Sequence, residues 1–157
     1  MKLYTSLFAM LVLLLSTSQC AHATDATVSA GETLVHGPGA LALDVMATQP
    51  SNILRGSYWY EGVTVIGAGQ FHERAYKTDV AVRAGLMVPV TGKLDLGLGI
   101  AALAHPLPFD NASGLDFNPQ AVYHINQRLT VTYTHFSDAG IRLPNLGRDV
   151  LLIGWRL

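Results

Sequence analysis

Side-chain polarity that alternates at every residue, in one segment after another, is the feature that most constrains the fold of this chain. Within 79–88, Asp79, Ala81, Arg83 and Gly85 alternate with aliphatic residues. The same alternation recurs in 93–100, 115–125 and 151–157. Because successive side chains of a β-strand point to opposite faces, these segments predict strands with one apolar face. Tilted strands of about 9–11 residues are long enough to cross a bilayer.

Turn-forming residues divide the chain into nine candidate strands. They are 27–34, 40–47, 53–60, 63–72, 79–88, 93–104, 115–125, 129–137 and 149–157. One of the short turns is expected at Glu61-Gly62, and longer polar connections fall near 105–114 and 138–148. Bacterial single-chain membrane barrels have even strand numbers, so one candidate is expected not to cross, and 27–34 and 63–72 are the weakest. The sequence therefore predicts an all-β, antiparallel, eight-stranded transmembrane β-barrel of the outer membrane.

The polar face of these strands carries both signs of charge. An eight-stranded barrel has room inside only for its own side chains, so the interior is expected to be closed rather than a pore. We expect ion pairs in this interior among Asp79, Arg83, Lys93 and Asp95. The Tyr-Trp-Tyr run at 58–60 is interpreted as part of an aromatic belt at the membrane interface, and the alternative is that these residues line a groove for an acyl chain.

The first 23 residues have the pattern of a secretory signal peptide. Lys2 gives a basic start, 7–15 is an apolar run, and Ala-His-Ala at 21–23 offers a cleavage site with small residues. The apolar run is shorter than the roughly 20 residues that a membrane-spanning helix needs. We therefore expect 1–23 to be removed and 24–157 to form the barrel. Cleavage would also remove Cys20, the only cysteine, so no disulfide is expected.

Composition supports this class without deciding it. The mean hydropathy of +0.31 is high for a soluble protein, and only 13% of the residues are charged. The net charge of −1 gives no electrostatic attraction to nucleic acid. An exported chain that is apolar but lacks a long continuous apolar stretch is typical of a membrane barrel. A soluble periplasmic or secreted β-domain is the alternative that composition leaves open.

Three polar residues are predicted to meet on the lipid-facing side of the barrel. His135 and Ser137 are two residues apart on one strand, so their side chains point to the same face. Asp149 has the parity of the outward Leu151 on the next strand, and the intervening loop makes the two strands antiparallel neighbours. A polar side chain among lipids costs free energy unless it is hydrogen-bonded, so this convergence predicts a site.

An imidazole, a hydroxyl and a carboxylate are the groups that activate a serine nucleophile. In that interpretation Ser137 attacks an ester carbonyl, His135 accepts its proton and Asp149 orients the imidazole. Asn145 and backbone N–H groups near Gly140 would stabilise the oxyanion. The alternative interpretation is a polar strand end that lies among lipid headgroups and does not react.

The wider motif resembles a known family. His-Phe-Ser-Asp-Ala-Gly-Ile at 135–141, followed by Pro-Asn at 144–145 and by an acid twelve residues after the serine, is similar to the lipid A 3-O-deacylase (PagL) family. The close match covers 131–157, and the upstream strands match only in pattern. The resemblance implies an eight-stranded outer-membrane barrel with a lipid-facing Ser-His-Glu site. It also implies hydrolysis of the ester-linked 3-hydroxyacyl chain at position 3 of lipid A, with no metal or other cofactor.

Carried over by position, the resemblance assigns a role to each residue of the motif. His135 falls on the family's base and Ser137 on its nucleophile. Asp149 stands where the family has a glutamate and is one methylene shorter. Gly140 and Asn145 fall on the loop positions at the oxyanion side.

Besides Asp149 in place of glutamate, Asp138 is a second departure from the family, because an asparagine usually follows the nucleophile. A carboxylate there either opposes an oxyanion or lies in the headgroup layer. Arg142 and Arg148, in the outer loop, are candidate contacts for the phosphates of lipid A, and a solvated loop charge is the alternative for each. The expected partners are lipopolysaccharide and outer-membrane lipids, and a homodimer is left open. The alternative function is a catalytically inactive barrel with a structural or adhesive role.

Overall fold

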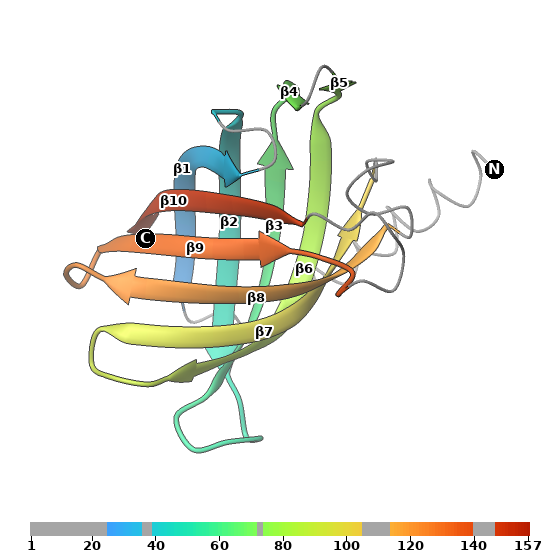
Figure 1. Ribbon diagram of the computed structural model, residues 1–157. Coiled ribbons are helices and arrows are strands. Elements are labelled where there is room, and N and C mark those ends of the chain that lie inside the picture. Colours follow the sequence, from blue (N-terminus) through green and yellow to red (C-terminus); the bar gives the residue numbers. More distant parts are fainter. Residues whose placement is uncertain (1–24, 36–38, 72–73, 105–113, 140–146) are drawn as a thin grey trace.

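The alternating segments close into one antiparallel barrel. The computed structural model describes residues 25–35, 39–71, 74–104, 114–139 and 147–157. The barrel strands are β1 (Asp25–Val35), β2 (Leu41–Pro50), β3 (Tyr58–Ile66), β6 (Asp79–Pro89), β7 (Leu94–Leu103), β8 (Leu115–His124), β9 (Leu129–Phe136) and β10 (Arg148–Arg156). They run around the barrel in the order β1-β10-β9-β8-β7-β6-β3-β2, and pairing of β1 with both β10 and β2 closes it (Figure 1). The predicted eight-stranded all-β barrel is confirmed.

The ninth candidate strand disappears because the predicted segments 53–60 and 63–72 share a single strand, β3. The turn expected at Glu61-Gly62 is wrong, since both residues lie inside that strand. A Cβ atom on Gly62 would stand 2.8 Å from the carbonyl oxygen of Val45, so this glycine permits close approach of β2 and forms no turn. The candidate 27–34, by contrast, crosses as part of β1. A short hairpin of β4 (Gly69–Phe71) and β5 (Arg74–Tyr76) extends the connection between β3 and β6.

A network of polar side chains fills the middle of the barrel. Arg83 on β6 donates to Asp44 on β2 and to Gln120 on β8, in both cases over 2.6 Å. Thr64 on β3 donates to the other carboxylate oxygen of Asp44 over 2.7 Å. The ion-pair partner of Arg83 is therefore Asp44, a residue that the sequence analysis did not select. These contacts link four strands across the interior.

Two further polar pairs lie near the two ends of the interior. Asp79 stands 3.8 Å from Arg148 at one end, and Asp95 stands 2.6 Å from the imidazole of His124 at the other. Asp79 and Asp95 are thus inside the barrel, as expected. Lys93 is not, because it belongs to the exposed turn between β6 and β7, and its predicted place in the interior is wrong.

Apolar side chains occupy the remaining interior in two clusters. One cluster, near the candidate site, consists of Ala42, Ile66, Ala81, Ala101, Phe136, Val150 and Leu152. The other, near the opposite end, consists of Met46, Tyr60, Met87 and Val122. With the polar network, these clusters pack the inside of the barrel with side chains.

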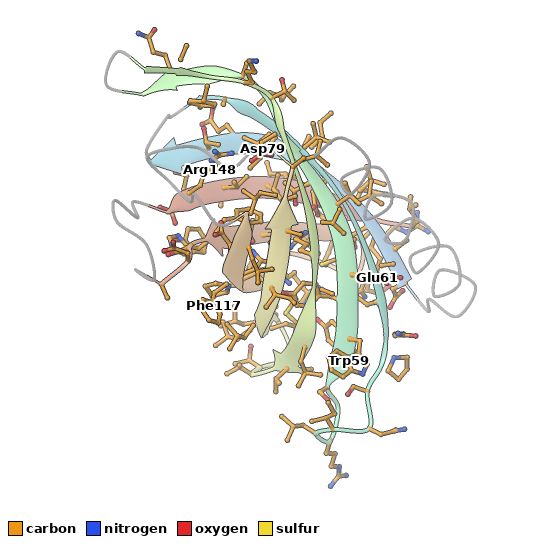
Figure 2. All side chains as sticks on the ribbon, turned by 90° about the vertical axis from the view of Figure 1, so that its right-hand side faces the viewer. Trp59, Glu61, Asp79, Phe117 and Arg148 are labelled. Atoms are coloured by element: carbon orange, nitrogen blue, oxygen red, sulfur yellow. The ribbon has the colours of Figure 1, made fainter. Side chains whose placement is uncertain are left out.

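The outside of the barrel carries an apolar band. Leu98 and Ile153 are 62% and 61% exposed, and many other large apolar side chains share this outward face. Trp59 is outward too, at the end of the barrel away from the Asp79–Arg148 pair (Figure 2). The neighbouring Tyr58 and Tyr60 face the interior, so assigning the whole run 58–60 to an aromatic belt is wrong. The alternation within β3 is the reason, because it turns every second side chain inward.

The two ends of the barrel are identified by the turns and strand ends that lie there. Leu157 hydrogen-bonds Ala26 over 2.9 Å, at the end where the turns 90–93 and 125–128 also lie. β9 ends and β10 begins at the other end. Among the described residues, no helix is long and apolar enough to span a bilayer.

Candidate active site

Strand register brings His135 and Asp149 side by side on the outer face. The two residues are direct partners in the antiparallel pair of β9 and β10. His135 Nδ1 lies 2.8 Å from Asp149 Oδ1, and the two side chains are 29% and 16% exposed. Inward Thr134 and Val150, both fully buried, show by alternation that this pair belongs to the outward face.

The contact favours one tautomer of His135. An ionised carboxylate can only accept hydrogen bonds, so with Asp149 ionised the Nδ1–H group of His135 donates the hydrogen bond to Asp149 Oδ1. In the neutral tautomer that carries its proton on Nδ1, Nε2 is the atom whose lone pair can accept a proton. The hydroxyl of Tyr133 donates to the same Oδ1 atom. Asp149 is therefore held by two donors from β9.

Ser137 continues the outward row immediately after β9. Its backbone forms an isolated antiparallel bridge with Phe117, with N–H···O distances of 2.7 and 3.1 Å. The flanking Phe136 and Asp138 are 0% and 1% exposed and point inward, so Ser137 shares the outward side with His135. The structure thus places the three residues at one end of the barrel, on the exterior surface.

The turn after Ser137 engages its side chain. The N–H of Ala139 donates to Ser137 Oγ over 3.1 Å. Ala139 has a φ of 56°, a left-handed conformation that costs free energy for a residue with a Cβ. Backbone strain of this kind is typical of functional sites, where the surrounding structure maintains it.

Gly147, the residue before β10, packs on the imidazole of His135. A Cβ atom on this residue would lie 2.5 Å from His135 Cε1 and 2.9 Å from Nε2. Its φ of 66° is also in the left-handed region that glycine tolerates. Both features require glycine at this position.

The remaining predicted site residues divide into two groups. Gly140, Arg142 and Asn145 lie outside the described residues. Arg148 is not in the outer loop. It begins β10, is 2% exposed, and its guanidinium lies inside the barrel 5.5 Å from the centre of the Tyr76 ring. Its assignment as a surface contact for phosphate is therefore wrong.

The location of Asp138 also differs from the one expected from the sequence. At 1% exposure its carboxylate is buried on the inward side, so it is not in a headgroup layer. It also points to the face of the chain opposite to that of Ser137, away from any ester that approaches the hydroxyl. The reason is again strand alternation, since Asp138 follows Ser137 by one residue.

Sequence reasoning missed Tyr133 and Gly147 as parts of the site. Tyr133 shares the parity of His135, so its position on the outward face could be read from the sequence, but its bond to Asp149 needs the register of β9 and β10. For Gly147 the only available signal was a glycine two residues before the acid. Among the described residues, no three His, Cys, Asp or Glu side chains are grouped so that they could hold a metal ion.

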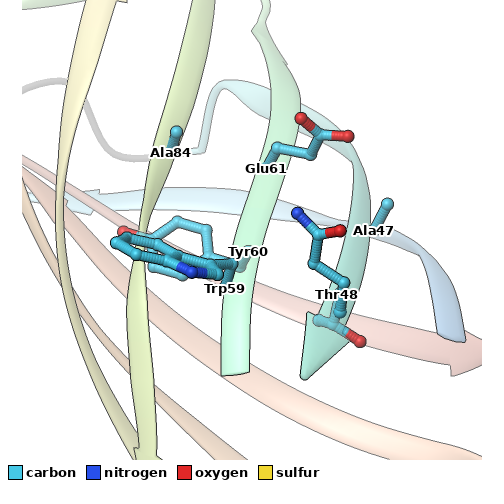
Figure 3. A pocket seen from close by; sticks show the side chains of 7 residues that line it. Ala47, Thr48, Trp59, Tyr60, Glu61 and Ala84 are labelled. Carbon is cyan, nitrogen blue, oxygen red and sulfur yellow. The ribbon is translucent and has the colours of Figure 1, made fainter. Parts of the chain in front are cut away.

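A separate depression of about 230 Å³ lies on the β2–β3–β6 wall, across the barrel from β9 (Figure 3). Its lining residues are Ala47, Thr48, Gln49, Trp59, Tyr60, Glu61 and Ala84. Glu61 is paired across the strands with Ala47 and Ala84, both small residues, which leaves the space above them open. This depression shares no residue with the candidate active site.

Comparison with known proteins supports the fold. The chain is similar to the crystal structure of the outer membrane enzyme PagL, with a TM-score of 0.63 and 17% sequence identity over 85% of this chain and 99% of that chain. It also matches the backbone structure of the outer membrane protein Ail of Yersinia pestis in a phospholipid nanodisc, with a TM-score of 0.48 and 11% identity over 85% and 99% of the two chains. No protein-family model matches, and no curated protein sequence matches. The similarity to the PagL structure shows that the chain has the fold of an outer-membrane barrel.

Proposed function

We propose that this chain is a serine-type lipid A 3-O-deacylase of the outer membrane, which hydrolyses the ester-linked 3-hydroxyacyl chain at position 3 of lipid A. The observation that carries the proposal is the His135–Asp149 hydrogen bond of 2.8 Å on the outer face of the barrel, two residues from Ser137. A charged or polar cluster that faces lipid is costly and is expected where it has a function.

The proposed reaction uses His135 as the general base. Ser137 Oγ attacks the ester carbonyl carbon while His135 Nε2 takes its proton, and Asp149 stabilises the imidazolium that forms. Collapse of the tetrahedral intermediate breaks the ester C–O bond, and the imidazolium returns the proton to the leaving sugar oxygen. Water, deprotonated by His135, then hydrolyses the acyl-serine, which releases the 3-hydroxy fatty acid and restores Ser137.

Tyr133 offsets the shorter acid of this chain. Aspartate reaches less far than glutamate, and the direct cross-strand position of Asp149 brings its carboxylate to His135 without the extra methylene. The second bond, from the Tyr133 hydroxyl, restricts the carboxylate to one orientation. We assign the oxyanion contacts to Asn145 and to backbone N–H groups near Gly140.

The surroundings of the site suit an acyl ester in a membrane. The outward face next to the trio is apolar, with Leu151 and Ile153 on β10 and Phe117 on β8 exposed. Acyl chains can lie against such a surface while the ester reaches Ser137. The site lies at the end of the barrel opposite Leu157. We assign the end that holds the site to the outer leaflet, where lipopolysaccharide resides. This orientation needs export, and the signal peptide 1–23 stays a prediction.

Mass spectrometry of lipid A tests the proposal. Cells that express the wild-type chain should yield lipid A lacking one 3-hydroxyacyl chain, and Ser137→Ala should leave lipid A intact because the nucleophile is gone. Ser51→Ala is the matched control, since Ser51 lies in the loop between β2 and β3, and it should deacylate like the wild type.

Intact lipid A in cells that hold the wild-type barrel inserted in the outer membrane would contradict the deacylase. That result would point to the alternative, a barrel without catalysis that has a structural or adhesive role. Deacylation that persists in Ser137→Ala would instead remove Ser137 from the mechanism.

A further inference from the structure

We propose that Asn118, from inside the barrel, positions His135 by replacing a backbone hydrogen bond that Pro119 removes. This inference rests on the proposed function only for its activity readout. The features that support it are the register of β8 and β9 and one side-chain amide.

The register puts Pro119 directly across from His135. Gln120 pairs with Thr134 on one side of this point, and Phe117 forms a bridge with Ser137 on the other. Both pairings belong to the same register. The continuous ladder of paired residues stops at Gln120–Thr134 and resumes only at Phe117–Ser137, so the interruption lies at the level of His135.

The missing bond is the one that the His135 carbonyl would receive. In an antiparallel pair, hydrogen-bonded residue pairs recur at every second position. Phe117 and Ser137 exchange both N–H···O bonds, so the next such pair is Pro119 with His135. Proline has no N–H group, which leaves the carbonyl of His135 without its ladder donor.

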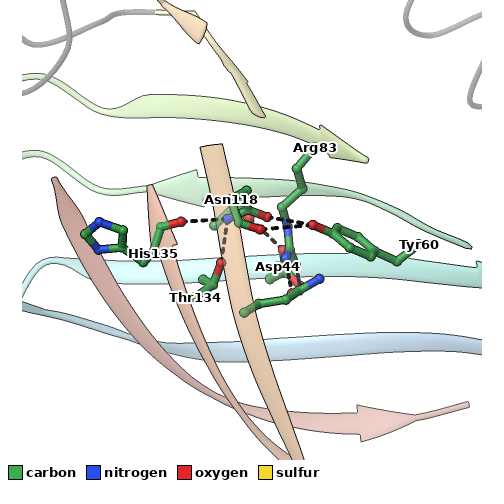
Figure 4. A network of polar contacts seen from close by, with 8 residues as sticks. Asp44, Tyr60, Arg83, Asn118, Thr134 and His135 are labelled. Atoms are coloured by element: carbon green, nitrogen blue, oxygen red, sulfur yellow. Dashed lines mark hydrogen bonds and ion pairs between the residues drawn. The ribbon is translucent and has the colours of Figure 1, made fainter. Parts of the chain in front are cut away.

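The Asn118 side chain supplies a donor at this place. Its Nδ2 atom donates to the backbone oxygen of His135 over 2.9 Å and to Thr134 Oγ1 over 2.7 Å (Figure 4). Asn118 is 0% exposed, and its side-chain oxygen Oδ1 accepts a hydrogen bond from the hydroxyl of Tyr60 over 3.2 Å. Its orientation is therefore fixed from both sides.

This bond acts on the site through the backbone. His135 lies at the penultimate position of β9, one residue before the end of the regular strand. Its carbonyl has no ladder donor on the β8 side, so without the Asn118 amide this peptide would be held from the β10 side alone. Rotation of the peptide would move the imidazole relative to Asp149 and Ser137, and catalysis is sensitive to shifts of about 1 Å. Asn118 is thus a positioning residue that touches neither substrate nor reacting atoms.

A double substitution separates positioning from general stabilisation. Asn118→Ala should lower kcat about tenfold with little change in KM, because the imidazole loses its fixed position while the lipid-binding surface is unchanged. Adding Pro119→Ala supplies a backbone N–H across from His135, so the double variant should return to within about threefold of wild type. Pro119→Ala alone should keep wild-type activity.

Thr134→Val is the matched control. It removes the other acceptor of the Asn118 amide and leaves the bond to His135, so its kcat should stay close to wild type. If Asn118→Ala does not insert, Asn118→Asp keeps the shape and replaces the donor by an acceptor, and Pro119→Ala should rescue it in the same way. Wild-type kcat in Asn118→Ala, or no rescue by Pro119→Ala, would overturn the proposal.

A second readout distinguishes failure of this inference from failure of the deacylase. The Nδ1–H proton of His135, observed by ¹⁵N-edited NMR of the barrel in micelles, should shift in Asn118→Ala and return toward its wild-type position in the double variant. This signal reports the His135–Asp149 contact even in a protein that deacylates nothing. An unchanged signal in Asn118→Ala would contradict positioning. If the signal shifts in Asn118→Ala and returns in the double variant, but the wild-type protein does not deacylate lipid A, only the proposed function is contradicted.

Discussion

A single carboxylate oxygen, Oδ1 of Asp149, organises the candidate site at the residue scale. It accepts from His135 and from Tyr133, both on the neighbouring strand. Each of the three side chains is outward because strands alternate, and they meet because the register of β9 and β10 pairs Asp149 with His135 and places Tyr133 two residues away on the same face. A slip of one residue would turn Asp149 into the barrel.

Gly147 provides the sharpest test at this scale. Gly147→Ala should reduce deacylation about a hundredfold or more, because the added methyl group displaces His135 and the φ of 66° becomes strained. Lipid A mass spectrometry over a time course measures the loss. Gly39→Ala is the matched control, since Gly39 also has a positive φ, 81°, but a Cβ there would meet nothing within 4 Å. Equal activity in the two variants would contradict a tight fit of Gly147 against the imidazole.

At the scale of the elements, each strand separates an inner from an outer environment, and β3 shows the cost of an exception. Glu61 lies on the outward face of β3 between Trp59 and Val63, and within the described residues it has neither an ion pair nor a hydrogen bond. An unpaired carboxyl group that faces lipid is destabilising to a degree that depends on its depth.

Glu61→Gln should therefore stabilise the barrel in phospholipid vesicles by about 1 kcal/mol, since the cost of an acidic side chain is smaller than that of a basic one. Urea unfolding followed by tryptophan fluorescence measures the difference. Lys93→Gln, in the exposed turn between β6 and β7, also removes one charge and should leave the unfolding midpoint unchanged. A midpoint lowered by Glu61→Gln would mean that this carboxyl group has a stabilising partner in the membrane.

The strands could be predicted from the sequence because alternation is local, and so could the outward faces of His135 and Asp149. Gly62 was misread as a turn because a glycine that permits close approach and a glycine that bends the chain look alike without the neighbouring strand. Tyr58 and Tyr60 were misread for a related reason, since an aromatic run hides which of its members faces inward. The predicted locations of Arg148 and Lys93 were wrong because both residues lie at strand ends. The exact end of a strand decides whether a charge is inside the barrel, and strand ends are the least certain part of an alternating pattern.

At the scale of the whole molecule, the polar network in the interior ties distant strands together. Arg83 reaches from β6 to Asp44 on β2 and to Gln120 on β8, and the side chains of Arg83 and Asp44 are 0% and 3% exposed. Breaking a buried ion pair leaves an uncompensated charge, which costs more than the pair itself contributes.

Arg83→Met should therefore destabilise the barrel by about 3–5 kcal/mol, and a further Asp44→Asn should recover much of that loss because it removes the unpaired charge. The urea midpoint in vesicles measures both steps. A double variant no more stable than Arg83→Met would show that shape, and not charge, determines the effect at this point of the interior.

In the part of the chain that the structure describes, side chains fill the interior, and the trio lies on the exterior wall, where an ester in the membrane can reach it. In the proposed enzyme the substrate arrives sideways, by diffusion in the plane of the bilayer, and never through solution. Its turnover would then follow the surface density of lipid A among the surrounding lipids. Dilution of lipid A with inert phospholipid should slow the reaction, whereas adding more water to the same vesicles should not.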